Sequence, residues 1–142
     1  MSLDKIFERF LPHNPVLDSP ISLDFIRSDQ TIFYDSHEIC FVFPPWGWNV
    51  KLAFGLKNQF KRKNISYVTY QFDESILSTD LELTVIAFDL IQRQFNRDVS
   101  LLGGNFEEIG VLGFSLGCVS AIRAANLSKR KIDNLDLICP HK

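Results

Sequence analysis

The chain has 142 residues, of which 46% are hydrophobic and 23% are charged. This balance excludes a disordered segment, a collagen-like fibre and a coiled coil. The net charge of −2, from 15 basic and 17 acidic residues, gives no electrostatic support for nucleic-acid binding. A chain of this length buries enough surface for one core, so we expect a single domain over residues 1–142.

The cysteines and the N-terminus favour a cytoplasmic protein. Cys40, Cys118 and Cys139 are an odd set without the paired spacing of a metal site or a disulfide framework. The first ten residues are charged throughout and lack the apolar core of a signal peptide. No apolar run is long enough to span a membrane. Motifs of the GxGxxG, Walker A and HExxH types are missing, so we expect no cofactor and no metal.

Residues 1–20 predict a short helix followed by a connector. Apolar residues between Leu3 and Leu11 recur with the spacing of one helical face, and Pro12 ends the pattern. A proline-containing connector then runs to Pro20. We expect the helix to pack on the domain, while residues 21–142 form a sheet with crossover helices.

The segment that follows predicts an antiparallel hairpin. Ile21–Arg27 alternates between apolar and polar residues, Ser28–Gln30 interrupts the pattern, and Thr31–Tyr34 resumes it. Two short strands around a polar turn are typical of a hairpin.

From residue 39 onward, strands and helices alternate. Ile39–Phe43 is a continuous apolar run, typical of a strand that is buried on both faces of a parallel sheet. The remaining predicted elements are a helix at Val50–Lys63, a strand at Ile65–Phe72, a helix at Thr79–Phe95 with a Thr79/Glu82 capping box, a strand at Glu108–Phe114, a helix at Leu116–Leu127 and a strand at Leu135–Cys139. This alternation predicts an α/β domain with a mostly parallel sheet and right-handed crossovers.

One segment carries a chemical signature, Gly113-Phe114-Ser115-Leu116-Gly117, which matches G-x-S-x-G. A predicted strand leads into it and a predicted helix leads out, which is the setting of a nucleophile elbow. Such a turn strains the serine backbone and exposes its Oγ above the sheet. The two glycines let strand and helix approach each other closely. The N-terminus of the helix also brings backbone N–H groups to a place where negative charge can develop.

Through this elbow, the chain from Ile21 to Cys139 resembles the α/β-hydrolase superfamily. The resemblance implies a serine hydrolase that acts on the ester or thioester of a small-molecule acyl substrate. Ser115 would attack the acyl carbon and form an acyl-enzyme. The backbone N–H of Leu116 would be one donor of the oxyanion hole.

The second donor of the oxyanion hole would come from the loop after strand Ile39–Phe43. That loop begins Pro44-Pro45-Trp46-Gly47, which is similar to the family's His-Gly-Trp-Gly loop with two prolines in place of His-Gly. Proline has no N–H, so Trp46 is the expected donor. Alternatively, the loop is a rigid aromatic plug over the sheet edge.

The resemblance also implies a catalytic acid and a histidine on loops after later strands. His13 lies in the connector, and His37 precedes a strand and therefore falls at the wrong edge of the sheet. His141 follows the last predicted strand and emerges at the edge of Ser115, close to the end of the chain. His141 is therefore the candidate base within this chain.

Asp73 and Glu74 also follow a strand at the edge expected for Ser115. We interpret both as solvated loop carboxylates. The acid of the triad is therefore not identified.

The predicted sheet ends after about its sixth strand, before the strands that usually carry the acid and the histidine. Three interpretations stay open: the N-terminal part of a longer hydrolase with its base beyond Lys142, a hydrolase with a non-standard base, or a non-catalytic binding module. An acyltransferase would share the acyl-enzyme and differ in the acceptor. The last strand, Leu135–Cys139, would be an exposed apolar edge, which predicts self-association.

Overall fold

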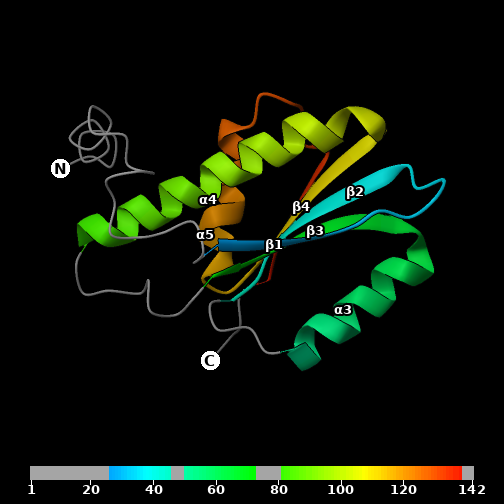
Figure 1. The fold of residues 1–142 in the computed structure, drawn as a ribbon, viewed down its shortest axis with the longest axis horizontal. Coiled ribbons are helices and arrows are strands. Elements are labelled where there is room, and N and C mark those ends of the chain that lie inside the picture. The colour runs from blue at the N-terminus through cyan, green and yellow to red at the C-terminus, as the bar shows by residue number, and fades with distance from the viewer. Residues whose placement is uncertain (1–25, 46–49, 73–80, 139–142) are drawn as a thin grey trace.

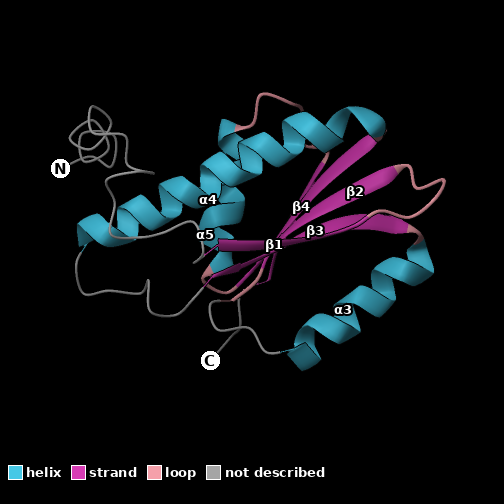
Figure 2. Ribbon diagram, viewed as in Figure 1, coloured by secondary structure: helices cyan, strands magenta, loops and turns pink. Residues whose placement is uncertain are grey.

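A computed structural model describes residues 26–45, 50–72 and 81–138 (Figure 1). The predicted N-terminal helix at Leu3–Leu11, its connector, and residues Thr79 and Cys139 lie outside this part of the chain. The described residues form one sheet with helices on both faces (Figure 2).

Five strands form the sheet in the order β1-β3-β2-β4-β5. They are β1 (Ile26–Thr31), β2 (Glu38–Phe43), β3 (Ile65–Phe72), β4 (Glu108–Phe114) and β5 (Asn134–Ile138). The pairs β2–β3, β2–β4 and β4–β5 are parallel, whereas β1 runs antiparallel to β3 at one edge. The structure therefore confirms an α/β fold with a mostly parallel sheet.

The predicted hairpin is wrong. Ser28–Gln30, expected as its turn, lies within β1, where Ser28 faces Tyr70 of β3. The chain turns later, at Asp35, which has a φ of 60° and is followed by a hydrogen bond from the Ser36 N–H to the Phe33 carbonyl. The physical reason is that β1 is an edge strand. Its polar side chains stay exposed while its backbone pairs with β3, so polarity does not mark a turn there.

Three helices cover the sheet: α3 (Val50–Lys63) on one face, and α4 (Leu81–Leu102) and α5 (Gly117–Leu127) on the other (Figures 1 and 2). The helix α4 continues past the predicted end at Phe95 because its buried side extends to Asp98 and Val99. A single 3₁₀ turn at Gly103–Asn105 follows it. None of the helices in the described ranges is long and apolar enough to cross a membrane.

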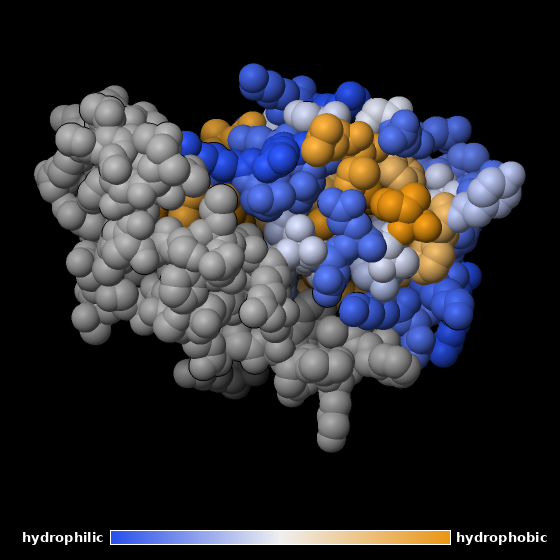
Figure 3. Space-filling model, in the orientation of Figure 1, coloured by the Kyte–Doolittle hydropathy of each residue, from blue (hydrophilic) through white to orange (hydrophobic). Residues whose placement is uncertain are grey.

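Alternate residues of the strands build a core on each face. The larger core lies against α4 and α5 and contains Phe41, Phe43 and Tyr70. The smaller core lies under α3, where Phe60 stacks on Tyr67 with ring centroids 5.1 Å apart. The central strand β2 is buried on both faces, as its apolar run predicts. On the molecular face drawn in Figure 3, hydrophobic residues reach the surface at several separate places between hydrophilic ones.

Candidate active site

Ser115 lies at the turn from β4 into α5, at the carboxyl edge of the parallel strands. Its φ is 53°, in the left-handed region that residues other than glycine rarely adopt. That conformation costs about 1–2 kcal/mol for an L-residue. The serine is exposed, so the strained turn presents it to solvent rather than to the core.

The two glycines of the motif are required by close packing. A Cβ on Gly117 would overlap the carbonyl oxygen of Phe43 and lie 2.6 Å from that of Pro44. A Cβ on Gly113 would lie 2.7 Å from the Cβ of Ala121. Glycine is therefore the residue that lets α5 start directly against the ends of β2 and β4.

Backbone hydrogen bonds hold the turn from both sides. The Ser115 N–H donates to the carbonyl of Ile138, the last residue of β5, over 2.8 Å. The Cys118 N–H donates to the Ser115 carbonyl over 2.9 Å, which closes the first turn of α5. The strained serine is therefore tied to the end of the neighbouring strand as well as to its own helix.

The N-terminus of α5 can stabilise an anion beside Ser115. Leu116 is the N-cap residue of α5, and its N–H is one of the amides that a helix start leaves without an intrahelical partner. The positive end of the helix dipole adds to its effect. Trp46, the other expected donor, lies outside the described residues. The chain enters that loop beside the elbow, since the Phe43 and Pro44 carbonyls pack on Gly117.

The structure does not bring a histidine to Ser115 within the described residues. His37 precedes β2, and the register of β2 with β4 places it at the opposite edge of the sheet, a whole strand length from Ser115. There its Nδ1 lies 3.6 Å from Oε1 of Glu107, and both side chains are exposed. His13 and His141 lie outside the described residues, as do Asp73 and Glu74.

The described cysteines are buried thiols. Burial, with Glu38 and Asp136 nearby, raises the pKa of Cys40 to about 12. Cys118 follows the elbow, and its Sγ lies 3.5 Å from the Gly113 carbonyl and 3.7 Å from that of Ile138. A thiol with so high a pKa holds its proton at neutral pH, so Cys40 is a poor nucleophile.

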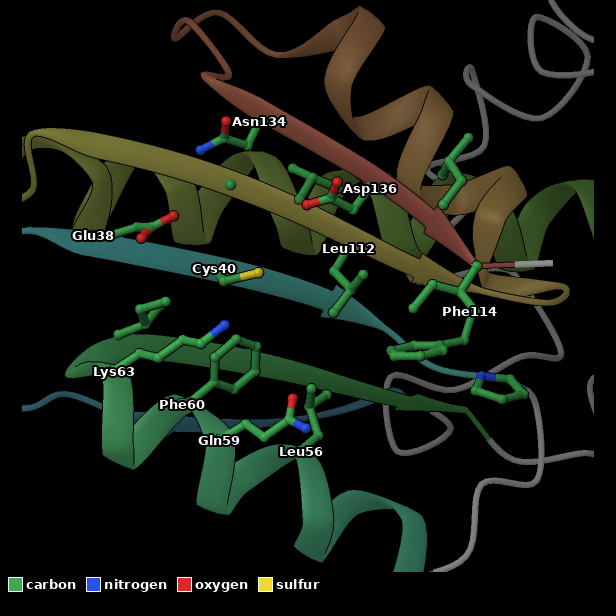
Figure 4. A pocket seen from close by; sticks show the side chains of 16 residues that line it. Glu38, Cys40, Leu56, Gln59, Phe60, Lys63, Leu112, Phe114, Asn134 and Asp136 are labelled. Atoms are coloured by element: carbon green, nitrogen blue, oxygen red, sulfur yellow. The ribbon is translucent and has the colours of Figure 1, made fainter. Parts of the chain in front are cut away.

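A groove of about 700 Å³ lies between α3 and the β4–β5 half of the sheet (Figure 4). The predictions from sequence missed it, because it depends on which strands become neighbours. Apolar side chains line most of it, among them Leu112 and Phe114. Glu38 and Lys63 line the end away from Ser115, and Asp136 lies halfway along β5, beside Leu112. Its volume is within the range of small-molecule pockets.

Within the described ranges, no group of three or more histidine, cysteine or acidic side chains could hold a metal ion. Comparisons with protein-family models and with curated proteins find no match for the chain.

Proposed function

We propose that this chain is a serine hydrolase of the α/β-hydrolase type that acts on an ester or thioester. The observation that carries the proposal is the backbone of Ser115, which has a φ of 53° while the residue is exposed between two tightly packed glycines. Strained residues of this kind persist where the surrounding structure over-determines them, and they cluster at active sites. A serine that only linked a strand to a helix would not need this conformation.

In the proposed reaction, Ser115 Oγ attacks the acyl carbon while a base takes the hydroxyl proton. The negative oxygen of the tetrahedral intermediate accepts hydrogen bonds from the N–H groups of Leu116 and Trp46. The alcohol or thiol then leaves with a proton from the base, and water hydrolyses the acyl-enzyme by the same steps. His141 is the candidate base because it follows β5, whose last residue, Ile138, is hydrogen-bonded to Ser115.

The architecture supports the hydrolase-like fold. An elbow at the end of a central parallel strand exposes its serine at the carboxyl edge, where open α/β sheets bind ligands. Here β4 lies between β2 and β5, and the loop that follows β2 starts beside the elbow. The loop after β2 therefore starts close enough to Ser115 to provide the second N–H donor of the oxyanion hole.

A second candidate function is a non-catalytic binding module on the same scaffold. The position of His37 favours it, because this histidine lies at the far edge of the sheet and cannot activate Ser115. Without a base, a serine hydroxyl is a weak nucleophile near neutral pH. An acyltransferase differs from the hydrolase only in the acceptor that removes the acyl group.

The deciding experiment is intact-mass analysis after incubation with a fluorophosphonate, on the wild type and on Ser115→Ala. Ser100→Ala, which changes an exposed serine on α4, is the matched control. The hydrolase proposal expects one adduct in the wild type and in Ser100→Ala, and none in Ser115→Ala. A folded wild type that forms no adduct would leave the binding module as the better proposal.

A further inference from the structure

The face of the sheet that carries α3 is only half covered in the described part of the chain. On the other face, α4 and α5 pack against the strands. On this face, α3 packs over β2 and β3 through Leu56 and Phe60. The β4–β5 half has no described helix above it, and the groove occupies that place (Figure 4). Parallel sheets are normally covered on both faces, and among the described residues no element covers this half of the sheet.

The dimensions of the groove match one helix. Helices that pack side by side lie about 8–10 Å apart, and strands lie about 4.8 Å apart, so one helix covers about two strands. A neighbour of α3 would therefore lie over β4 and β5. The groove follows the length of β2, a six-residue strand, and at about 3.3 Å per residue this is ~20 Å. A helix of about 13 residues has that length.

The lining of the groove combines an apolar floor with two acidic side chains, Glu38 at the end away from Ser115 and Asp136 beside Leu112 (Figure 4). Leu112 and Phe114 of β4, with Leu56 and Phe60 of α3, give the floor an aliphatic and aromatic surface. The residue at position 110 is a glycine, which opens the floor between Cys40 and Asn134. A partner element must therefore offer a continuous apolar face.

Negative charge is in excess along the groove. Glu38 and Asp136 line it, and Glu108 and Asp133 are close enough to act on Glu38. Lys63 is the one cation that lines the groove in the described ranges. Burial, followed by repulsion from Glu108, raises the pKa of Glu38 above its ordinary range. The charge that complements the groove is therefore positive.

We propose that the groove binds an amphipathic α-helix of a partner protein, which lays an aliphatic face on the floor and places lysine or arginine beside Glu38 and Asp136. Burial of the floor supplies the affinity. The cations set the orientation and select against acidic helices. The proposal is independent of the hydrolase activity of Ser115.

The test is fluorescence anisotropy with labelled helical peptides of about 18 residues. The first peptide has a leucine face and a lysine face, the second has glutamate in place of every lysine, and the third is a scramble of the first without an apolar face. We expect the lysine peptide to bind at least tenfold tighter than either of the others. Equal binding of the lysine and glutamate peptides would overturn the charge argument and with it the proposal.

Two protein variants locate the binding. A Cβ at Gly110 meets its nearest atoms at 3.8 Å, so Gly110→Phe fills the groove without a clash at the backbone. It should weaken the lysine peptide at least tenfold, while Gly55→Phe, at an open position on α3, should not. Unchanged affinity in a folded Gly110→Phe variant would place the peptide elsewhere and refute the proposal.

The charge variant is Glu38→Gln with Asp136→Asn, and its matched control is Glu107→Gln with Asp29→Asn, which removes two exposed acids outside the groove. We expect the first pair to weaken the lysine peptide about fivefold and the control to leave it unchanged. Equal effects of the two pairs would show a general charge attraction and would overturn the assigned site. Light scattering completes the test: a wild-type dimer that Gly110→Phe converts to a monomer would assign the groove to a second copy and refute the partner helix.

Discussion

Asp98 of α4 is buried beside Tyr70 of β3, and replacing it with asparagine should leave the protein at least as stable at neutral pH. The Tyr70 Oη donates to Oδ2 of Asp98 over 2.6 Å, and Nε2 of Gln94 donates to Oδ1 over 3.0 Å. Asp98 is 3% exposed, and burial raises its pKa above the ordinary range although both hydrogen bonds lower it. The ionised carboxylate therefore costs the native state free energy.

The magnitude follows from what each variant does to the buried donors. In Asp98→Asn the new side-chain carbonyl can accept from Tyr70 Oη, and the new amide can donate to the side-chain oxygen of a rotated Gln94, so both hydrogen bonds keep a partner. We expect the free energy of unfolding at pH 7 to stay equal or rise by up to about 1 kcal/mol. In Asp98→Ala the Tyr70 hydroxyl loses its acceptor, which costs about 1–3 kcal/mol.

The pH dependence has a definite sign. Because the pKa of Asp98 is higher in the native state than in the unfolded state, the native state holds this proton more tightly. Wild-type stability therefore falls as pH rises from the unfolded pKa through the native one, and acidification from pH 7 towards pH 4 restores it. The advantage of Asp98→Asn over the wild type should shrink over the same interval.

The assay is urea unfolding of the wild type, Asp98→Asn and Asp98→Ala at several pH values between 4 and 7. Asp29→Asn, at an exposed position of β1, is the control and should give a difference that is small at every pH. A difference between the wild type and Asp98→Asn that grows on acidification would refute the reasoning. It would mean that the two donors outweigh burial and hold the pKa of Asp98 below that of the unfolded chain.

Three further predictions concern the site and the edge of the sheet. Gly117→Ala should destabilise the protein by about 3 kcal/mol or more in urea unfolding, because the added Cβ overlaps a neighbouring carbonyl. The control Gly55→Ala, at an open position of a helix, should stabilise the protein by up to about 1 kcal/mol. A mild effect of Gly117→Ala would contradict the close packing. His37→Ala should leave fluorophosphonate labelling of Ser115 unchanged, and a large loss would mean that this histidine reaches the site. We propose that the exposed edge of β5 drives self-association. In light scattering, the average molar mass of the wild type should then rise with concentration, while Leu137→Lys should stay monomeric. A wild type that is monomeric at all concentrations would contradict the proposal.

Much of the fold was predictable because its signals are local in sequence. The apolar run of β2 and the amphipathic patterns of α3 and α5 reflect burial against the sheet, which any parallel arrangement demands. The two wrong predictions of the fold, the hairpin turn and the end of α4, both come from polar residues. Ser28–Gln30 lies in an edge strand, and Asp98 is satisfied by Tyr70, 28 residues away, so α4 continues past an apparent polar end. Neither partner is visible from neighbouring residues.

The candidate site also has one part that could be predicted from local sequence and one part that could not. The strained backbone of Ser115 was predictable because the strand-to-helix turn and the spacing of Gly113 and Gly117 are properties of a single segment. The groove was not predictable because its lining comes from α3 and three strands, and it exists only because β5 pairs with β4. The opposite-edge position of His37 required only the direction of β2.

The elbow and the groove share β5, and this connection makes a final prediction. Ser115 is an exposed residue at a turn, yet its N–H donates a hydrogen bond to the Ile138 carbonyl. All five residues of β5 are exposed, so opening of this edge strand is the expected route by which the Ser115 amide exchanges with solvent. In hydrogen exchange followed by NMR, the Ser115 amide should therefore exchange at the rate of the β5 amides and more slowly when the lysine peptide fills the groove. Exchange at the rate of an unprotected amide would mean that the hydrogen bond to Ile138 does not hold the elbow. The strain at Ser115 would then be retained by the packing of Gly113 and Gly117 alone.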